Sequence, residues 1–201
     1  MTTPISTQPD DPQTLRANLE QRVAFIVDEA RRQGASASEV GVSQNTGLSV
    51  GVRKGEVETV EFNRDQGFAI TLYAGQRKGS EDPCAGLADA DLMAQQVPDL
   101  DLFHPWNISA EAAIDKALAL EAAALEVDSR LTTDSAQVST QQGCRVYGNS
   151  HGFIGSSMGS RHRAAAVLIV GSEQGMQRDY WYAVDRIADR LPSEQEIGRK
   201  A

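Results

Sequence analysis

The amino-acid sequence predicts an α+β fold in which a layered antiparallel sheet carries its helices packed on one face. Apolar and polar residues alternate over residues 39–73, which is the period of a strand with one buried face. Segments with helical spacing precede and follow this region, and a second β-rich region begins at Ala136. Because several strands follow one another without an intervening helix, this order favours antiparallel layers over a doubly wound parallel sheet.

Residues 39–73 are predicted to form four strands. Apolar side chains two positions apart mark them, in the groups Val40 and Val42, Leu48 to Val52, Val60 and Phe62, and Phe68 to Leu72. We expect turns at Asn45-Thr46-Gly47, Lys54-Gly55 and Asp65-Gln66-Gly67, because glycine readily adopts the positive φ of a tight hairpin. Such a meander is not stable alone in water, so neighbouring segments must cover its apolar face.

The first predicted helix is the natural cover for this face. Asp11 is placed to cap it, and Pro12 suits its first position, where a missing N–H costs nothing. Apolar residues then recur at helical spacing until Arg31 and Arg32, which favour the end of a helix.

Two further helices are predicted from their capping residues. Ser109 is expected to cap a helix that ends by about Asp128. Ser193 and Glu196 form a capping box for a third helix, which reaches Ala201 after barely two turns. Because so short a helix is marginal by itself, we expect the full product to continue beyond this residue.

The second β region, from Ala136 onward, contains two contrasting stretches. Residues 164–170 are apolar on both faces, which predicts a central strand covered twice. Residues 155–163 are polar on both faces, so we expect them to be exposed or near a partner. Within them, Arg161, His162 and Arg163 form a dense basic spot that we interpret as a solvated strand face.

The predicted organisation has three parts. Residues 1–12 form a disordered tail, residues 13–130 an N-terminal α+β domain, and residues 131–201 a second β region that ends in the start of a helix. The sequence passes abruptly from Ser80 to Glu81, with no element to carry the chain away from the sheet edge. We therefore suspect that a segment is missing at this position.

Composition narrows the class of protein. A net charge of −9 argues against binding to nucleic acid, and no apolar run is long enough to span a membrane. The N-terminus lacks the features of a secretory signal, and the two cysteines, Cys84 and Cys144, fit a reducing compartment with free thiols. We therefore expect a cytoplasmic protein.

No catalytic or metal-binding residue is predicted, and the binding residues are unknown. His104, His151 and His162 lack a second ligand at helical spacing, and Cys84 lies in an acidic run that disfavours a thiolate. No nucleophile elbow or phosphate-binding loop occurs. Asp99 and Asp101 form a weak acid pair that we interpret as part of a solvated loop.

Four stretches resemble a known family: NTGLSVGVRKGEVETVEFNRDQGFAITLYAGQRKGS, DPCAGLADADLMAQQVPDLDLFHPW, CRVYGNSHGF and QRDYWYAVDR. They are similar to the N-terminal region of the PmbA/TldE branch of the TldD/PmbA metalloproteases, which are also called modulators of DNA gyrase. The similarity runs from about Gln13 onward. It implies only the first half or less of the family protein, and it implies a helical segment in the family where this chain passes from Ser80 to Glu81.

The resemblance implies a function in proteolysis. In this family a TldD subunit with an HExxxH zinc site pairs with a PmbA/TldE subunit that lacks those ligands, and the heterodimer cuts unfolded or modified peptides in peptide maturation and antitoxin degradation. No position here matches the metal motif, so we expect this chain alone to be non-catalytic and zinc to belong to a TldD-like partner. Self-association is the other partner arrangement left open.

Two alternatives come from other classes. The first is a regulatory interaction domain of the DNA gyrase modulator type, with no part in proteolysis. The second is a free-standing enzyme that uses His151, for which the surrounding turn offers no identifiable partner group.

Overall fold

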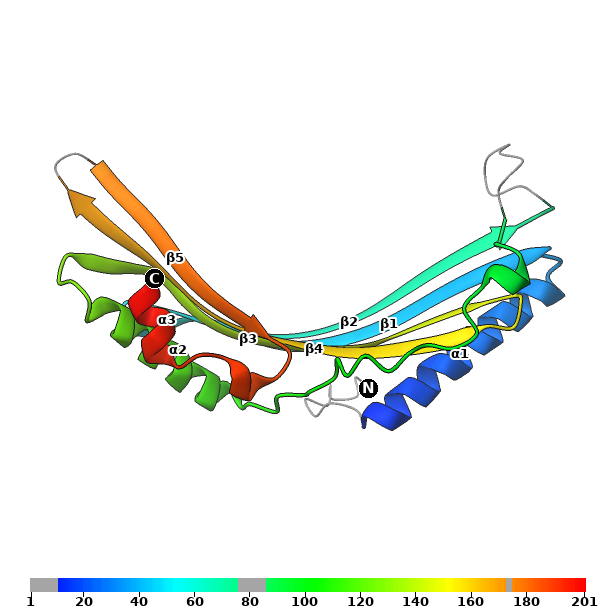
Figure 1. The fold of residues 1–201 in the computed structure, drawn as a ribbon, viewed down its shortest axis with the longest axis horizontal. Helices are drawn as coiled ribbons and strands as arrows, with labels where there is room; N and C mark the ends of the chain where they lie inside the picture. Colours follow the sequence, from blue (N-terminus) through cyan, green and yellow to red (C-terminus); the bar gives the residue numbers. More distant parts are fainter. Residues whose placement is uncertain (1–10, 76–85, 173–174) are drawn as a thin grey trace, which may run out of the picture. The chain divides into compact units, whose positions relative to one another are not determined.

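The computed structural model describes residues 11–75, 86–172 and 175–201. It contains α1 (Pro12–Arg32), β1 (Ala37–Arg53), β2 (Glu56–Tyr73), α2 (Ala110–Leu125), β3 (Leu131–Asn149), β4 (Ile154–Ser172), β5 (Gly175–Asp185) and α3 (Glu194–Lys200), with short 3-10 turns at Ala90–Leu92 and Ala188–Arg190. The strands form one antiparallel sheet in the order β2-β1-β3-β4-β5 (Figure 1). The predicted α+β class is therefore confirmed.

All three helices begin where their caps predict. The Asp11 carboxylate accepts a hydrogen bond from the backbone N–H of Thr14 at 2.8 Å, and Pro12 is the first residue of α1. Ser109 accepts in the same way from Ala112 at 3.1 Å, and Ser193 accepts from Glu196 at 3.2 Å. These side chains satisfy N–H groups that have no partner inside the helix.

The prediction of four strands within residues 39–73 is wrong, because β1 and β2 run through two of the three expected turns. Only Lys54 and Gly55 take positive φ values, 54° and 77°, and they form the turn between the two strands. Gly47 and Gly67 instead lie inside strands, where the absence of a side chain lets a neighbouring strand come close. A Cβ at Gly67 would lie 2.9 Å from the Ser43 hydroxyl, and one at Gly47 would lie 3.0 Å from the Thr140 carbonyl oxygen.

The chain packs as two compact units, and β1 to β4 each contribute one part to each. The α1 unit comprises Met1–Asn45, Asp65–Leu100 and Gly143–Met158, and the α2 unit comprises Thr46–Arg64, Asp101–Gln142 and Gly159–Ala201. The proposed boundary at 130/131 stays a prediction. Residues 1–10, which make up most of the expected tail, and the Ser80/Glu81 junction lie outside the described residues.

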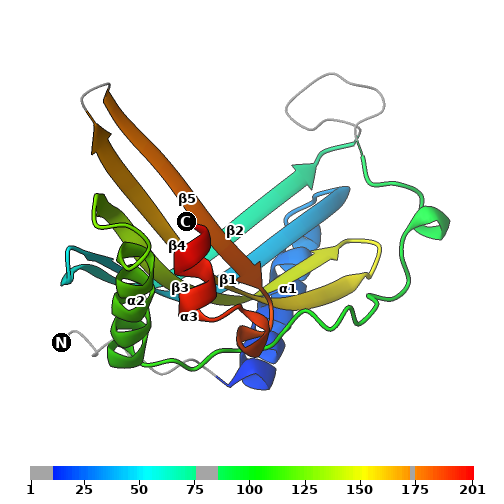
Figure 2. The same ribbon diagram turned by 60° about the vertical axis from the view of Figure 1, so that its left-hand side comes forward.

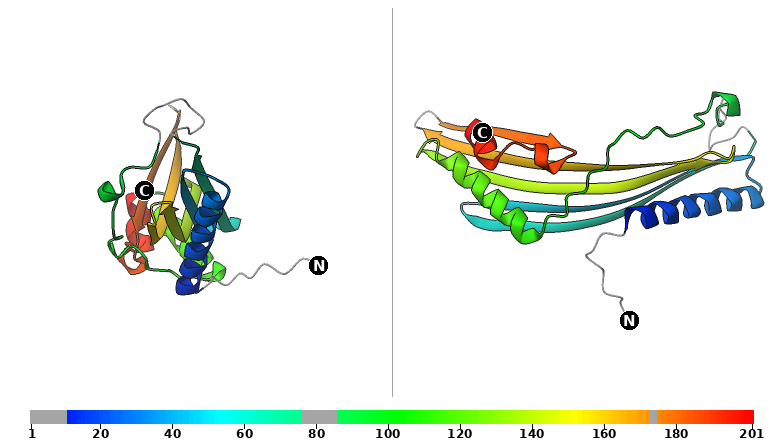
Figure 3. Two further views of the ribbon diagram at one scale, coloured as in Figure 1. Left: turned by 90° about the vertical axis from the view of Figure 1, so that its right-hand side faces the viewer. Right: turned by 60° about the horizontal axis from the view of Figure 1, so that its bottom comes forward.

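In the α1 unit, α1 lies lengthwise along the strands, as Figure 3 shows in blue. Its inward stripe meets alternate side chains of β1 and β3 in one core. The fully or nearly buried members are Leu19, Val23, Val27, Val40, Val42, Cys144 and Val146. Burying each Val or Leu contributes about 1.5–3 kcal/mol, so this contact holds the unit together.

A carboxylate joins three strands in the α1 unit. Glu39 on β1 accepts hydrogen bonds from the phenol of Tyr73 on β2 at 2.7 Å and from the phenol of Tyr147 on β3 at 3.1 Å. The hydrogen bond to Glu39, together with burial, raises the pKa of Tyr73 to about 12.

The α2 unit has its own core, in which α2 and α3 lie side by side against the strands (Figure 2). Leu48, Val50 and Val52 of β1 meet Leu120 of α2 and Ile197 of α3 in this core. Gly198 lets the helices approach closely, because a Cβ there would lie 2.8 Å from the backbone nitrogen of Ala124.

A buried carboxylate fixes the turn between β1 and β2. Glu121 on α2 is 3% exposed, and its two oxygens accept from the backbone N–H groups of Lys54 at 2.6 Å and Gly55 at 2.7 Å. Hydrogen bonds to a charged group are stronger than neutral ones, so this pair ties the hairpin to the helix.

We expect Tyr73→Phe to change how stability depends on pH. The folded pKa of Tyr73, about 12, lies above the ordinary tyrosine pKa of about 10, so its stabilising contribution is complete below pH 10 and is lost as pH rises toward 12. Urea unfolding at pH 8 and pH 11 should show a smaller loss for Tyr73→Phe than for the unaltered chain. Tyr180→Phe is the control, and equal losses in all three proteins would contradict the prediction.

Glu121→Gln should lower the free energy of unfolding by about 2 kcal/mol, because an amide offers one acceptor and turns its NH2 group toward the other N–H. Urea unfolding monitored by circular dichroism measures this change. Glu126→Gln, at an exposed position near the end of the same helix, should alter stability by less than about 0.5 kcal/mol. A Glu121→Gln protein as stable as the control would show that the turn is held by other contacts.

Candidate functional site

Two of the three histidines, His104 and His162, meet in the α2 unit. His162 is fully buried, and its Nε2 lies 2.9 Å from the backbone oxygen of His104. Because a carbonyl oxygen can only accept, Nε2 carries the proton. Nδ1 lies 2.9 Å from the hydroxyl of Thr140, from which it accepts in the neutral ring. The Trp106 ring packs edge-on with its centroid 5.4 Å away.

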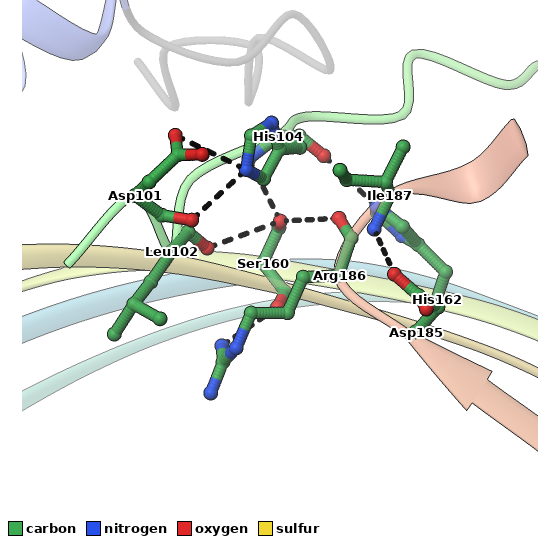
Figure 4. Close-up of polar contacts among 8 residues, drawn as sticks. All are labelled: Asp101, Leu102, His104, Ser160, His162, Asp185, Arg186 and Ile187. Atoms are coloured by element: carbon green, nitrogen blue, oxygen red, sulfur yellow. Dashed lines mark hydrogen bonds and ion pairs between the residues drawn. The ribbon is translucent and has the colours of Figure 1, made fainter. Parts of the chain in front are cut away.

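Ser160 is the centre of a second set of bonds beside this histidine (Figure 4). Its hydroxyl accepts from the backbone N–H of His104 at 2.9 Å and donates to the backbone oxygen of Arg186 at 3.0 Å. Its backbone N–H donates to the backbone oxygen of Leu102 at 2.9 Å. The Arg186 guanidinium donates to the backbone oxygen of Ser160 at 3.0 Å. These bonds attach the segment at residues 102–104 and the segment at Arg186 to β4. We call His104, Thr140, Ser160 and His162 the histidine cluster.

The expectation that residues 155–163 are exposed is wrong for Ser160 and His162, which are 2% and 0% exposed. The Asp101 carboxylate and carbonyl oxygens lie 3.3 Å and 2.9 Å from Nε2 of His104. The Ser160 hydroxyl, however, bonds the backbone of His104 and not its ring. A hydroxyl nucleophile needs an adjacent general base, and the hydroxyl beside a ring nitrogen in this cluster, that of Thr140, faces an imidazole with no exposed surface. These contacts support a structural role for the cluster.

The remaining candidates from the sequence are His151, Cys144 and Cys84. His151 lies exposed in the turn after β3, where its backbone N–H donates to the buried Asn149 side chain at 3.1 Å. Cys144 is a buried free thiol whose pKa is raised by burial, which disfavours a thiolate. Cys84 lies outside the described residues. Across residues 11–75, 86–172 and 175–201, no three His, Cys, Asp or Glu side chains gather as a metal site would require.

A cavity of about 210 Å³ in the α2 unit lies among Trp106, α2 and the segment that leads into α3. Lys116 and Glu194, two of its lining residues, form an ion pair at 2.6 Å. Because the two charges are paired with each other, the cavity offers no free charge at this point to recognise a ligand.

The outer strand β5 carries the best candidate for a binding surface. It pairs with β4 so that Tyr182 lies opposite Ala165 and Tyr180 opposite Val167. Ala183 packs toward the helix-covered core, so the alternate side chains, Tyr180 and Tyr182, point to the other face. They are 57% and 49% exposed, and β5 is the last strand in the sheet order.

The exposed tyrosines of β5 are held in place by each other and by arginine. The two rings stack with centroids 6.2 Å apart, and the Arg163 guanidinium lies 5.6 Å from the centroid of Tyr182. Arg178 pairs with Asp134 at 2.7 Å. Tyrosine and arginine dominate the energetics of many interfaces, so this face, which we call the tyrosine face, suits a peptide or protein partner.

Sequence reasoning missed the tyrosine face. Tyr180 and Tyr182 lie two positions apart in a predicted β segment, which is a signal for a shared face. Arg163 was assigned to a solvated basic spot, because its contact with Tyr182 becomes visible only once the register between β4 and β5 is known.

Two family models match this chain. The PmbA/TldA metallopeptidase domain 1 matches residues 38–123, and the central domain of the same family matches residues 103–201. The chain belongs to the PmbA/TldD family of metallopeptidases.

No helix in the described part of the chain is long and apolar enough to cross a membrane.

Curated relatives agree with this family. The chain is 38% identical over 207 residues to a metalloprotease PmbA homolog of Haemophilus influenzae, covering 90% of this chain and 46% of the relative. It is 37% identical over 210 residues to metalloprotease PmbA of Escherichia coli O157:H7, covering 91% and 46%. The chain thus spans about half the length of the relatives it matches.

Solved structures share the fold. A protein of Bacteroides thetaiotaomicron, described as a proposed modulator of DNA gyrase, superposes with a TM-score of 0.79 at 20% identity, over 92% of this chain and 48% of that one. TldE from Thermococcus kodakarensis superposes with a TM-score of 0.66 at 13% identity, over 89% and 46%.

The alignments contain positions that this chain does not fill. The Haemophilus influenzae alignment runs over 207 positions but takes in 90% of 201 residues, about 181, which leaves about 26 positions to the relative alone. The Escherichia coli alignment, at 210 positions and 91%, about 183 residues, leaves about 27. Both relatives therefore have about this many more residues than this chain within the matched region.

Ser160→Ala should lower the free energy of unfolding by about 1–3 kcal/mol, because it leaves the partly buried His104 N–H and Arg186 oxygen without their partner. Urea unfolding measures the change. Ser157→Ala, at an exposed position of the same strand, is the matched control and should change stability by less than about 0.5 kcal/mol. Equal effects of the two substitutions would contradict the structural role assigned to the histidine cluster.

Proposed function

We propose that this chain is the N-terminal part of the PmbA/TldE-type subunit of a TldD/TldE-type metalloprotease that acts on unfolded or modified peptides in the cytoplasm. Its role is to hold the peptide, and the exposed β5 edge with its tyrosine face is the observation that carries the proposal. The names of the curated relatives, metalloprotease PmbA, support the link to proteolysis.

An outer strand suits an unfolded substrate. The backbone N–H and C=O groups on the free side of β5 can pair with an extended peptide, which gives affinity with little demand on sequence. Tyr180 and Tyr182 then offer flat rings to alternate side chains of the peptide. Arg163, held over Tyr182, adds a positive charge next to them.

Zinc, in this proposal, belongs to a TldD-like partner. The described residues of this chain offer no group of three metal-binding side chains, so no step of peptide hydrolysis is assigned to them. The partner arrangement is a heterodimer with the TldD-like subunit, with self-association as the other form.

A regulatory interaction domain is the second candidate, since two structural relatives are described as proposed modulators of DNA gyrase. Co-purification separates the two. The proposed function requires a stoichiometric complex of the complete subunit with a TldD-like protein, and the alternative requires capture of gyrase without one.

The peptide-holding role is tested by titrating a fluorescently labelled, unstructured peptide into this chain and following anisotropy. Tyr182→Asp should weaken binding about ten-fold, as expected for loss of a central aromatic contact worth about 1–2 kcal/mol. Ala122→Asp places the same charge on the outer surface of α2 in the same unit and should leave the affinity unchanged. Equal affinities in all three proteins would rule out the tyrosine face as the peptide site.

A second measurement tests the absence of catalysis. The chain supplied with Zn²⁺ should leave the peptide intact over hours, as judged by mass spectrometry. Cleavage that a chelator abolishes would show that the non-catalytic role is wrong.

A further inference from the structure

Three arginines of the α2 unit lie on the face that carries Tyr180 and Tyr182, and two of them belong to β4. Arg161 and Arg163 are two positions apart, so both point to the face opposite the buried His162. The contact of Arg163 with Tyr182 agrees with this direction, because the guanidinium carbon lies 5.6 Å from the ring centroid. Both side chains therefore belong to the tyrosine face.

The third arginine, Arg186, follows the end of β5 and reaches the same face. Its guanidinium donates to the backbone oxygen of Ser160, and a Cβ at Gly159 would lie 3.5 Å from its Nη1 atom. Gly159 lies two positions before Arg161 on β4, so a Cβ there would point to the tyrosine face. Figure 4 shows the Arg186 side chain on the opposite side of Ser160 from His104. We call these three arginines the arginine group.

No carboxylate among the described residues neutralises the arginine group. The ion pairs formed within residues 11–75, 86–172 and 175–201 all involve other side chains. Arg163 has the Gln137 amide oxygen 3.5 Å from Nη1, and Arg186 has a backbone oxygen. Arg178, on β5, is by contrast paired with Asp134 at 2.7 Å. In a chain of net charge −9, three such guanidiniums on one face indicate a site for an anion.

The arginine group lies where a peptide added to β5 would place its side chains. Arg163 lies opposite Val184 in the register of β4 and β5, and it leans over β5 to Tyr182. A strand added to the free side of β5 would lie about 4.8 Å beyond it, with side chains on one face about 7 Å apart. Those on the tyrosine face would lie beside Val184 and Tyr182, within reach of the guanidinium.

Carboxylates are the anions that suit this place. A guanidinium presents a planar set of N–H donors that matches a carboxylate, and such charge-assisted bonds are stronger than neutral ones. A nucleic acid is the other polyanion, but proteins that bind its phosphates carry an extensive basic surface, which a net charge of −9 opposes. An extended peptide, in addition, can pair with the backbone of an outer strand.

We propose that the arginine group selects acidic peptides, in which Glu or Asp occupies alternate positions on the side that meets the tyrosine face. The proposal rests on the proposed peptide-holding function and adds a class of substrate to it. The tyrosine rings supply contact area that is independent of charge, and the arginines supply the preference.

The test compares three labelled, unstructured peptides of equal length that differ only at alternate positions, which hold Glu, Gln or Lys. In fluorescence anisotropy at about 50 mM salt, the Glu peptide should bind this chain about five-fold more tightly than the Gln peptide, and the Lys peptide should bind most weakly. At about 500 mM salt the advantage of the Glu peptide should fall below about two-fold, because salt screens exposed charges.

Arg163→Gln and Arg161→Gln should each reduce the advantage of the Glu peptide to about two-fold, while the affinity for the Gln peptide stays within about two-fold of the unaltered chain. The Gln peptide thus reports whether each variant keeps its fold. Arg199→Gln removes the same charge from an exposed position on α3 in the same unit and should leave the five-fold advantage intact.

Four results would overturn the proposal. Equal affinities for the Glu and Gln peptides would do so and leave the peptide-holding function standing, whereas binding of none of the three peptides would end both. An advantage that survives both Arg163→Gln and Arg161→Gln would assign the preference to other groups. Displacement of the Glu peptide by an equal concentration of a single-stranded oligonucleotide would assign the arginine group to nucleic acid.

Discussion

The alternation of side chains along β1 is the constraint on which both units depend. Val40 and Val42 face the core of the α1 unit, and Leu48, Val50 and Val52 face the core of the α2 unit. Because the period of a strand is two, a register shift of one residue would expose all five. The two-residue turn at Lys54 and Gly55 sets the pairing of β1 with β2, and Glu121 holds that turn against α2.

Local signals in the sequence were sufficient to predict where the helices begin and to predict the class of fold. Asp11, Ser109 and Ser193 each cap a helix through a bond to a residue three positions away, which is information that a short window of sequence contains. The strand count was not accessible in this way. Glycine at positions 47 and 67 indicates a turn and a close contact between strands equally well, and only the pairing of the strands decides between them.

The candidate sites were harder to predict from the sequence, because they are formed by contacts between residues far apart in the chain. The burial of Ser160 and His162 follows from segments near positions 102 and 186, so a polar stretch of β4 that looks solvent-exposed in isolation becomes the inner side of a bonded network. The resemblance to the metalloprotease family was carried by long stretches of sequence and is confirmed by the family models. The tyrosine face could be predicted only by knowing that β4 lies beside β5.

Residues 68–73, Phe-Ala-Ile-Thr-Leu-Tyr, combine high β propensity with the absence of charge and proline, and they lie on an outer strand. Such a run is the kind of segment that nucleates cross-β aggregation when its hydrogen-bonding edge is free. The charges of Arg64 and Asp65 precede it by only a few residues and act as gatekeepers. The colloidal behaviour of this protein at high concentration therefore depends on whatever shields this strand.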